Sequence, residues 1–334
     1  MIVQRYCSEP MIGMVLAGAA LMQLQVAAFA PFAQPARLSP HCSGALYRAS
    51  RLLPRSVNGV CVASSQADTA EATDSSAAKP SGKGVEDVVP SYRRLYDAAM
   101  ELLEAELELE AYPIPEGLAG KSAVVGTGRS QQRVETSIMA FQAPKLRQIR
   151  VALVETDGPT QVLNFVIFPD PSYDLPIFGA DLVSLPGVHL ICVDLQPARD
   201  GQNLGDGNDA ALRKINRRHA EGLPWGGDLP DAARKYFSPS CLWSKVDPKQ
   251  PVEEKALNAM MDYLREFLRL VASAEAEGTD SAQAKLTEGQ ADYCNYRRVN
   301  DPARGMLTRF YGAEWTEAVI EGILFDFRPK QEQP

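Results

Sequence analysis

One acidic residue lies in a segment that otherwise has the composition of a buried strand. Residues 174–187 read DLPIFGADLVSLPG, and Asp181 is enclosed there by apolar residues on both sides. An unpaired charge in such surroundings is costly to desolvate, so a carboxyl group there has a raised pKa or takes a partner. A protonated carboxyl group suits general acid catalysis near neutral pH. Two alternatives follow for Asp181: a proton donor in a dry pocket, or a structural acid paired with a buried arginine such as Arg150.

A second acidic residue, Asp301, precedes Pro302, and this pair is typical of the N-cap and first position of a helix. Gly312 suits the far end of that helix. Arg297 lies four residues before Asp301, so the two side chains can share one side of a helix end. The spacing therefore fits a helix cap with a structural ion pair, and it also fits a charged pair that faces a pocket.

The elements that must position these residues are strands followed by helices. Strand-like segments occur in close succession at 136–142, 147–155, 161–168, 177–185 and 188–195. Their short connections contain Gly and Pro, which predicts hairpins in an antiparallel meander. Apolar spacing predicts helices at 92–112, 253–274, 282–299, 302–311 and 314–324, and a long polar stretch separates strands from helices at 198–240. We expect an α/β fold in one domain at 85–330: a three-layer α/β/α sandwich with a central antiparallel sheet flanked by helices.

Charge and residue counts exclude several functions for that domain. Seven of the 34 basic and four of the 42 acidic residues precede Val85, which leaves 27 basic against 38 acidic residues after it. This acidic balance argues against a nucleic-acid partner. Cys192, Cys241 and Cys294 are widely spaced and form no CxxC motif, and only two histidines follow Val85. The counts predict neither a metal centre nor a disulfide framework.

The first 84 residues have the composition of targeting segments. Residues 11–30 are apolar and rich in small residues, which predicts a signal peptide at 1–30; a transmembrane helix is the alternative. Residues 31–67 are basic, hydroxylated and free of acidic residues, and 68–84 read as a linker. The whole resembles the bipartite leaders of algae whose plastids have extra membranes. We therefore expect a plastid transit peptide and linker at 31–84, import into the plastid stroma, and a mature form without a membrane anchor.

Three segments are specific enough to indicate a family. They are QVLNFVIFPDP at 161–171, YDLPIFGADLVSLPGVHLICVDLQP at 173–197 and NDPARGMLTRFYGAEWTEAVIEGILFDF at 300–327. Together they resemble the ferredoxin-dependent bilin reductases, over about residues 86–328. The resemblance implies an open-chain tetrapyrrole held between the sheet and the carboxy-terminal helices. It also implies that no flavin, metal or nicotinamide is bound: reduced ferredoxin delivers single electrons, and the protein supplies protons to a substrate radical.

The resemblance assigns roles to the acidic residues already singled out. Asp181 corresponds to the family's acid on the sheet side of the bilin, the usual candidate for proton donation. Asp301 corresponds to the second acid, on the helix side, and a helix cap that faces the pocket would allow both roles. Arg297 would bind a propionate or tune Asp301.

Further residues bear on substrate binding and on the branch of the family. Arg147 and Arg150 are candidate propionate contacts, and Asn164 is either a substrate contact or a satisfied amide of the core. In the branch that forms phycocyanobilin, the positions of Asn164 and Ala152 hold His and Glu. Without these two acid–base groups, reduction of the D-ring vinyl group is disfavoured and a single two-electron step is expected.

The form of the motifs indicates the substrate. DPARGMLTRF and FGADLVSLPG are most similar to the branch that reduces the A-ring diene of 15,16-dihydrobiliverdin to give phycoerythrobilin. We expect this bilin as substrate, ferredoxin as electron donor and a possible handover from the preceding bilin reductase. Two alternatives stay open: a reductase that converts biliverdin to dihydrobiliverdin or phytochromobilin, and a carrier that binds bilin without reducing it. Because ferredoxins are acidic, docking requires a basic patch, and the candidates lie at 213–218 and at Arg234-Lys235.

Overall fold

The computed structural model describes residues 87–199 and 204–327. The leader segments predicted at 1–30 and 31–84 lie outside the described residues. Among the helices within the described ranges, none combines the length and the hydropathy needed to cross a membrane.

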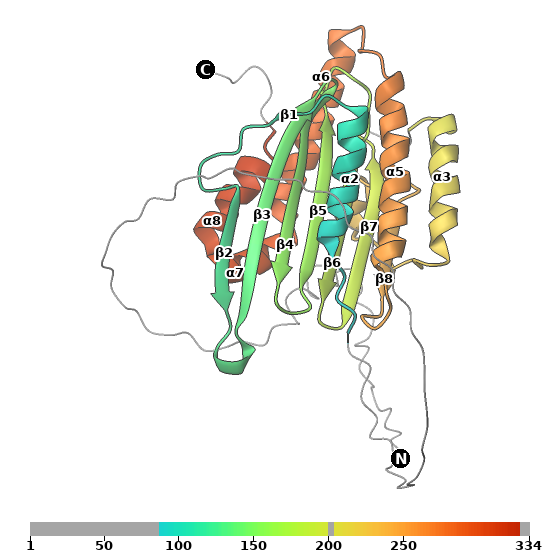
Figure 1. Cartoon of the computed structure of the whole chain (residues 1–334). Coiled ribbons are helices and arrows are strands. Elements are labelled where there is room, and N and C mark those ends of the chain that lie inside the picture. The colour runs from blue at the N-terminus through green and yellow to red at the C-terminus, as the bar shows by residue number, and fades with distance from the viewer. Residues whose placement is uncertain (1–86, 200–203, 328–334) are drawn as a thin grey trace, which may run out of the picture. The chain divides into compact units, whose positions relative to one another are not determined.

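Eight antiparallel strands form one sheet (Figure 1). Their order is β1-β3-β4-β5-β6-β7-β8, and β2 also pairs with β3. The meander predicted from the short connections is confirmed, since β3 to β7 are neighbours in sequence order. The strands are β1 (Glu110–Ala111), β2 (Gly120–Val125), β3 (Gln132–Ala143), β4 (Leu146–Thr156), β5 (Gln161–Pro169), β6 (Ile177–Leu185), β7 (Val188–Gln196) and β8 (Leu242–Val246).

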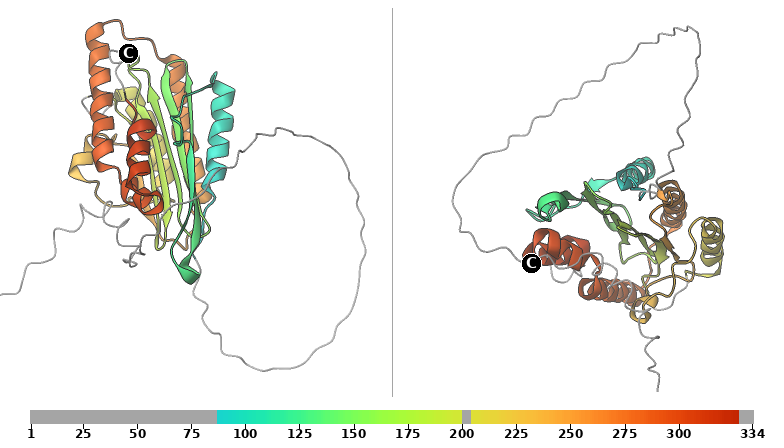
Figure 2. Two further views of the ribbon diagram at one scale, coloured as in Figure 1. Left: turned by 90° about the vertical axis from the view of Figure 1, so that its left-hand side faces the viewer. Right: turned by 90° about the horizontal axis from the view of Figure 1, so that it is seen from below.

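Helices cover both faces of this sheet, as Figure 2 shows edge-on. The helices α2 (Tyr92–Glu106) and α5 (Glu253–Ser273) pack on one face, and α3 (Asp206–Ala220) packs against α5. The other face is covered by α6 (Asp280–Asn300), α7 (Ala303–Tyr311), α8 (Ala313–Val319) and a π-helical turn (Ile320–Leu324). The short helix α4 (Asp231–Arg234) and a 3-10 turn (Gly128–Ser130) lie in connections. The three-layer α/β/α sandwich is therefore confirmed.

Side-chain alternation along the central strands builds a separate core on each face of the sheet. On β4, Ile149, Val151 and Leu153 pack toward the α2 and α5 layer. Ala152 and Val154 of the same strand belong to the second core, under the carboxy-terminal helices. The polar residues of interest, Asn164 and Asp181, follow the second pattern, and this alternation places them beneath α6.

Strands β2 and β8 were not predicted, and β3 begins at Gln132, before the predicted 136. Two further differences have a clear local cause. The helix predicted at 92–112 ends at Glu106, because Leu107 and Leu109 both pack on the core at a spacing of two, which only extended chain allows. Residues 110–111 then join the sheet as β1. The polar stretch at 198–240 contains α3 and α4. Helix α3 was missed because it buries little more than Leu212 and Asp209 and so carries a weak apolar pattern.

Candidate active site

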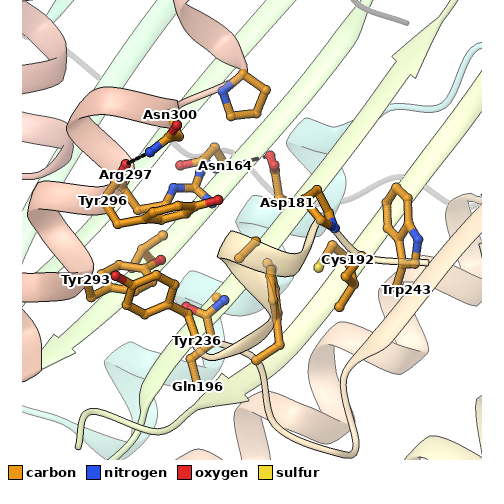
Figure 3. Close-up of a pocket in the computed structure, with 18 of the residues that line it drawn as sticks. Asn164, Asp181, Cys192, Gln196, Tyr236, Trp243, Tyr293, Tyr296, Arg297 and Asn300 are labelled. Atoms are coloured by element: carbon orange, nitrogen blue, oxygen red, sulfur yellow. Dashed lines mark hydrogen bonds between the residues drawn. The ribbon is translucent and has the colours of Figure 1, made fainter. Parts of the chain in front are cut away.

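A cavity of about 310 Å³ lies between the sheet and helix α6 (Figure 3). This volume is within the range of small-molecule sites, roughly 300–1,000 Å³. The wall is mostly apolar and includes a small set of polar residues. The polar and aromatic lining residues are Asn164, Asp181, Cys192, Gln196, Tyr236, Phe237, Trp243, Tyr293, Tyr296, Arg297 and Asn300.

The floor of the cavity is one row of residues across four strands. In the register of the sheet, Asn164 on β5 is opposite Asp181 on β6, Asp181 is opposite Cys192 on β7, and Cys192 is opposite Trp243 on β8. Residues directly opposite each other share a face of the sheet, with Cβ atoms about 4.5–5.5 Å apart. Ala152 on β4 continues the row beyond Asn164. Asp181 is thus the one carboxyl group in this row.

Asp181 is held by an amide rather than by a direct cation. Its Oδ1 atom accepts a hydrogen bond from Nδ2 of Asn164, at 3.1 Å. The Oδ1 atom of Asn164 in turn accepts a hydrogen bond from Nη1 of Arg150. Burial raises the pKa of Asp181 above its usual range, and the field of Arg297 and the bond from Asn164 oppose the rise only in part. The expected pairing with Arg150 therefore runs through Asn164, and the carboxyl group retains its affinity for a proton.

Helix α6 supplies the opposite wall through four residues at helical spacing. Tyr293, Tyr296, Arg297 and Asn300 all line the cavity, and positions i, i+3, i+4 and i+7 share one face of a helix. Only Arg297 of these four residues was singled out from the sequence. The shared spacing of two tyrosines, an arginine and an asparagine was the signal that would have identified the whole face.

Asp301 ends this wall and has two structural partners. Its Oδ2 atom accepts a hydrogen bond from Nη2 of Arg297 at 2.8 Å, and its Oδ1 atom accepts one from the backbone N–H of Ala303, also at 2.8 Å. The capping bond predicted from Asp301-Pro302 is therefore present, although the helix proper begins at Ala303. Asp301 is itself buried, whereas its neighbours Asn300 and Pro302 line the cavity.

Arg147 and Arg150 lie beside the site and are absent from the residues that line the cavity. Arg147 donates a hydrogen bond to the carbonyl of Asp326, and Arg150 donates one to the carbonyl of Leu324, each at 2.7 Å. The bulge between Leu146 and Gln148 brings Arg147 to the face of the carboxy-terminal layer, and ordinary strand alternation places Arg150 on that face with Ala152 and Val154. The prediction that they hold propionates gains no support from these positions; instead, both fix the end of the chain.

A strap formed by residues 229–241 closes the side of the cavity over β7 and β8. It contributes Leu229, Ala233, Tyr236 and Phe237 to the lining. One end is fixed to the sheet, because the buried carboxylate of Asp194 accepts hydrogen bonds from the backbone N–H and the hydroxyl of Ser238. The other side contacts α6, where the Tyr236 hydroxyl donates to Oδ2 of Asp292 at 2.9 Å. The strap was not predicted from the sequence, because its residues have no repeating pattern.

Three polar atoms of cavity-lining residues are buried and find no partner among the described residues. They are Nε of Arg297, Oε1 of Gln196 and Nε1 of Trp243. Buried polar groups are normally paired, because an unpaired one costs about 1–3 kcal/mol. The three residues line the cavity, but the unpaired atoms themselves are closed to solvent, so a ligand pairs with them only if their side chains reorient. Within the described ranges, no group of three or more His, Cys, Asp or Glu residues is arranged to hold a metal ion.

The sequence matches the ferredoxin-dependent bilin reductase family over residues 96–326, and the chain belongs to that family. Among curated proteins it is 46% identical to a phycoerythrobilin:ferredoxin oxidoreductase of Nostoc punctiforme, over 72% of this chain and 95% of that protein. A second protein with this name, from Gloeobacter violaceus, is 45% identical over 72% of this chain and 97% of its own length.

A solved structure of similar fold also matches this chain. Phytochromobilin synthase from tomato, crystallised in complex with biliverdin, superposes with a TM-score of 0.63 at 29% sequence identity. The match covers 70% of this chain and 83% of that one. The tomato protein, which was crystallised with a bilin, is thus similar in fold.

Proposed function

We propose that this protein catalyses the ferredoxin-dependent reduction of 15,16-dihydrobiliverdin to phycoerythrobilin. The reaction adds two electrons, delivered one at a time by two reduced ferredoxins, and two protons across the A-ring diene. The curated relatives bear the name of this activity at 40–46% identity. No bound flavin, metal or nicotinamide is required by this chemistry, because the redox equivalents come from ferredoxin.

The observation that carries the proposal is the single carboxyl group in the row of residues on the cavity floor. Asp181 is flanked in that row by Asn164 and Cys192, and Ala152 follows Asn164. A floor with one acid suits a single reduction step that needs one proton donor at that position. The same row offers no acid–base group for a second reduction at the D-ring.

Asp181 is proposed to protonate the bilin radical that forms when the first electron arrives. Burial raises the pKa of Asp181 and so favours its protonated form, and Asn164 fixes the orientation of the carboxyl group. Electron arrival makes the tetrapyrrole more basic, so a proton moves from the carboxyl oxygen to the pigment. The largely apolar wall excludes competing water from that transfer.

Arg297 and Asp301 are proposed to serve the other face of the pigment. Arg297 keeps one buried N–H without a partner among the described residues while its Nη2 atom bonds to Asp301. That free donor fits a propionate or a lactam oxygen of the bilin. Asp301 holds Arg297 in place, and Arg297 would transmit to it any change in charge on the pigment. A second proton donation by Asp301 requires a shift of Arg297 toward the substrate.

The product spectrum decides between the possible reactions. The full chain is mixed in separate reactions with 15,16-dihydrobiliverdin and with biliverdin, each with ferredoxin and a system that reduces it. We expect dihydrobiliverdin to be converted to phycoerythrobilin and biliverdin to remain unreduced. Consumption of biliverdin with dihydrobiliverdin left unchanged would assign the protein to another branch of the family. Binding of both pigments without reduction of either would identify a carrier.

The location of the reaction is a separate proposal that rests on the amino-terminal sequence. We propose that residues 1–30 direct the chain into the secretory route and that residues 31–84 then carry it into the plastid stroma. A fluorescent protein fused behind residues 1–84 should accumulate in the plastid of an alga with extra plastid membranes. A fusion that lacks residues 1–30 should stay in the cytosol, and plastid import of that shorter fusion would contradict the proposal.

A further inference from the structure

Two cysteine thiols lie side by side at the edge of the cavity floor. The Sγ atoms of Cys192 and Cys241 are 3.8 Å apart, and both thiols are free. Cys192 lines the cavity and is partly exposed, whereas Cys241 is buried. The proposed reduction uses neither thiol. Two thiols this close, with one open to a cavity, form a site at which oxidation can join them.

The position of Cys192 connects this pair to the proton donor. Cys192 on β7 is opposite Asp181 on β6 in the register of the sheet, and it is opposite Trp243 on β8. Figure 3 shows Cys192 on the same side of the cavity as Asp181 and Trp243. A change in the position of the Cys192 sulfur therefore alters the floor beside the acid on which the proposed reaction depends.

We propose that Cys192 and Cys241 are a redox-sensitive thiol pair that closes to a disulfide under oxidising conditions, and that the disulfide form binds the bilin more weakly. The inference rests on the proposed function, because it assigns a regulatory state to the same cavity.

The oxidation is a two-electron step, with a hydroperoxide as the oxidant. The Cys192 thiolate attacks one oxygen of hydrogen peroxide, which forms a sulfenic acid and releases water after protonation. The Cys241 sulfur then attacks the Cys192 sulfur and displaces a second water. Two thiols and one peroxide thus give one disulfide and two waters. Cys192 reacts first because peroxide reaches it through the cavity. The hydrogen bond with Cys192, together with burial, raises the pKa of Cys241 and so makes Cys241 the less reactive thiol.

Closing the bridge requires movement at the end of the strap. A disulfide has an S–S distance of about 2.05 Å, so the two sulfurs must approach from 3.8 Å. Cys241 directly precedes β8, and its carbonyl accepts a hydrogen bond from Asn216 of α3 at 3.2 Å. Residues 240 and 241 therefore carry the adjustment, together with Ser238, which is bound to Asp194. Because Tyr236 and Phe237 of the strap line the cavity, the adjustment changes its shape.

Thermodynamic linkage requires that bilin binding also affects the oxidation of the thiol pair. If the disulfide form binds the bilin more weakly, then bound bilin must favour the thiol form by the same factor. Bilin in the cavity also covers Cys192, which is the thiol that peroxide reaches first. We therefore expect the pigment to protect the pair from oxidation.

The test combines peptide mapping, which detects the disulfide, with a titration that measures bilin affinity. The full chain is treated with hydrogen peroxide, the peroxide is removed, and the protein is digested without reduction. We expect a linked pair of peptides that contain Cys192 and Cys241, and bilin affinity that is lower by about fivefold or more, the lower end of typical coupling between sites. Dithiothreitol should restore the affinity. Saturation with 15,16-dihydrobiliverdin before peroxide should slow the formation of the link.

Matched variants separate the pair from other thiols. Cys241→Ala should bind bilin normally before treatment. After a limited dose of hydrogen peroxide it should form no disulfide and should keep its affinity for bilin. Cys294→Ala, which removes a buried thiol of α6 outside the pair, should respond to peroxide as the unchanged protein does. Absence of the linked peptides, or unchanged bilin affinity in protein that is fully linked, would overturn the inference. Neither measurement needs turnover, so a failure of the proposed reaction is detected separately.

Discussion

The chemistry of Asp181 follows from the side chains that lie next to it. Asn164 donates one hydrogen bond to the carboxyl group, while the nearest arginines are engaged elsewhere: Arg150 with Asn164 and Leu324, and Arg297 with Asp301. A direct ion pair would have lowered the pKa of Asp181, whereas burial dominates and raises it. At the residue scale, the site therefore combines a fixed orientation of the Asp181 carboxyl group with a raised pKa.

This arrangement predicts how the rate depends on pH. Only protonated Asp181 can donate, so single-turnover reduction of bound bilin should slow as the pH rises through the raised pKa of Asp181. Burial also raises the pKa of Asp194, to about 7, so Asp194 is a second buried acid whose titration can slow the reaction as the pH rises. The variant Asp194→Asn should keep the alkaline fall in rate, because Asp181 is unchanged in it. A fall that disappears in Asp194→Asn and persists in Asp181→Asn would contradict the assignment.

Arg150 is predicted to act as a positioning residue. Arg150→Met removes the donor to Asn164, so the amide and then Asp181 lose their alignment, and kcat should fall by roughly 10- to 100-fold with a small change in KM. The matched control is Arg147→Met, which removes a partly buried arginine bound to the carbonyl of Asp326. Both variants should lose stability in a thermal melt. An equal loss of kcat in both would show that Arg150 contributes only to folding.

At the scale of elements, the strap and helix α6 complete a cavity that the sheet alone leaves open. The strap is anchored by a buried carboxylate without a cation: Asp194 accepts two hydrogen bonds from Ser238. Ser238 Oγ also accepts the backbone N–H of Ser240 at 3.1 Å. Through these bonds one serine fixes the turn that leads from the cavity wall into β8.

Ser238→Ala should therefore loosen the wall without touching the proton donor. We expect KM for the bilin to rise by about fivefold, equivalent to about 1 kcal/mol for a lost hydrogen bond, with kcat nearly unchanged. Ser244→Ala is the matched control, since its buried hydroxyl on β8 finds no hydrogen-bond partner among the described residues. Steady-state kinetics with both variants provide the test. A fall in kcat without a rise in KM would assign Ser238 a role other than holding the strap.

The sequence predicted the central elements well and the cavity only in part. Strands β3 to β7 and helix α5 have strong apolar periodicity, so local pattern and tertiary structure agree. Asp181 was found because a carboxyl group is unusual in its apolar segment. Asp301 was found because Asp-Pro is typical of a helix start, and Arg297 because it lies four residues before Asp301. The row from Asn164 to Trp243 depends on strand register, and the contact of Tyr236 with Asp292 depends on packing across 56 positions. Neither leaves a periodic signal in one sequence.

At the scale of the whole molecule, the acidic domain must still bind an acidic electron donor. Helix α3 carries exposed basic residues at Arg213, Lys214 and Arg217, beside β8 at one end of the sheet order. Lys235, in the second basic candidate, is instead paired with Asp292 at 2.7 Å. The basic surface of α3 is therefore the better candidate for docking of ferredoxin.

Charge reversal on α3 tests this surface. The double variant Arg213→Glu with Lys214→Glu should raise KM for ferredoxin by roughly tenfold at low salt, and the difference should shrink as salt screens the charges. Arg129→Glu is the control, because Arg129 is an exposed residue of the turn between β2 and β3, at the other end of the sheet order. Arg129→Glu changes the net charge by half as much as the double variant, so a shift in log KM half as large would show a dependence on net charge alone.

The most direct test of the account compares the unchanged protein with Asp181→Asn during one turnover. Each is loaded with 15,16-dihydrobiliverdin and mixed with reduced ferredoxin while the pigment spectrum is followed. We predict that Asp181→Asn binds the pigment as before, accepts the first electron, and forms phycoerythrobilin at least about 100-fold more slowly, as for loss of a general acid. Formation of phycoerythrobilin by Asp181→Asn at the unchanged rate would contradict the central claim that Asp181 donates the proton.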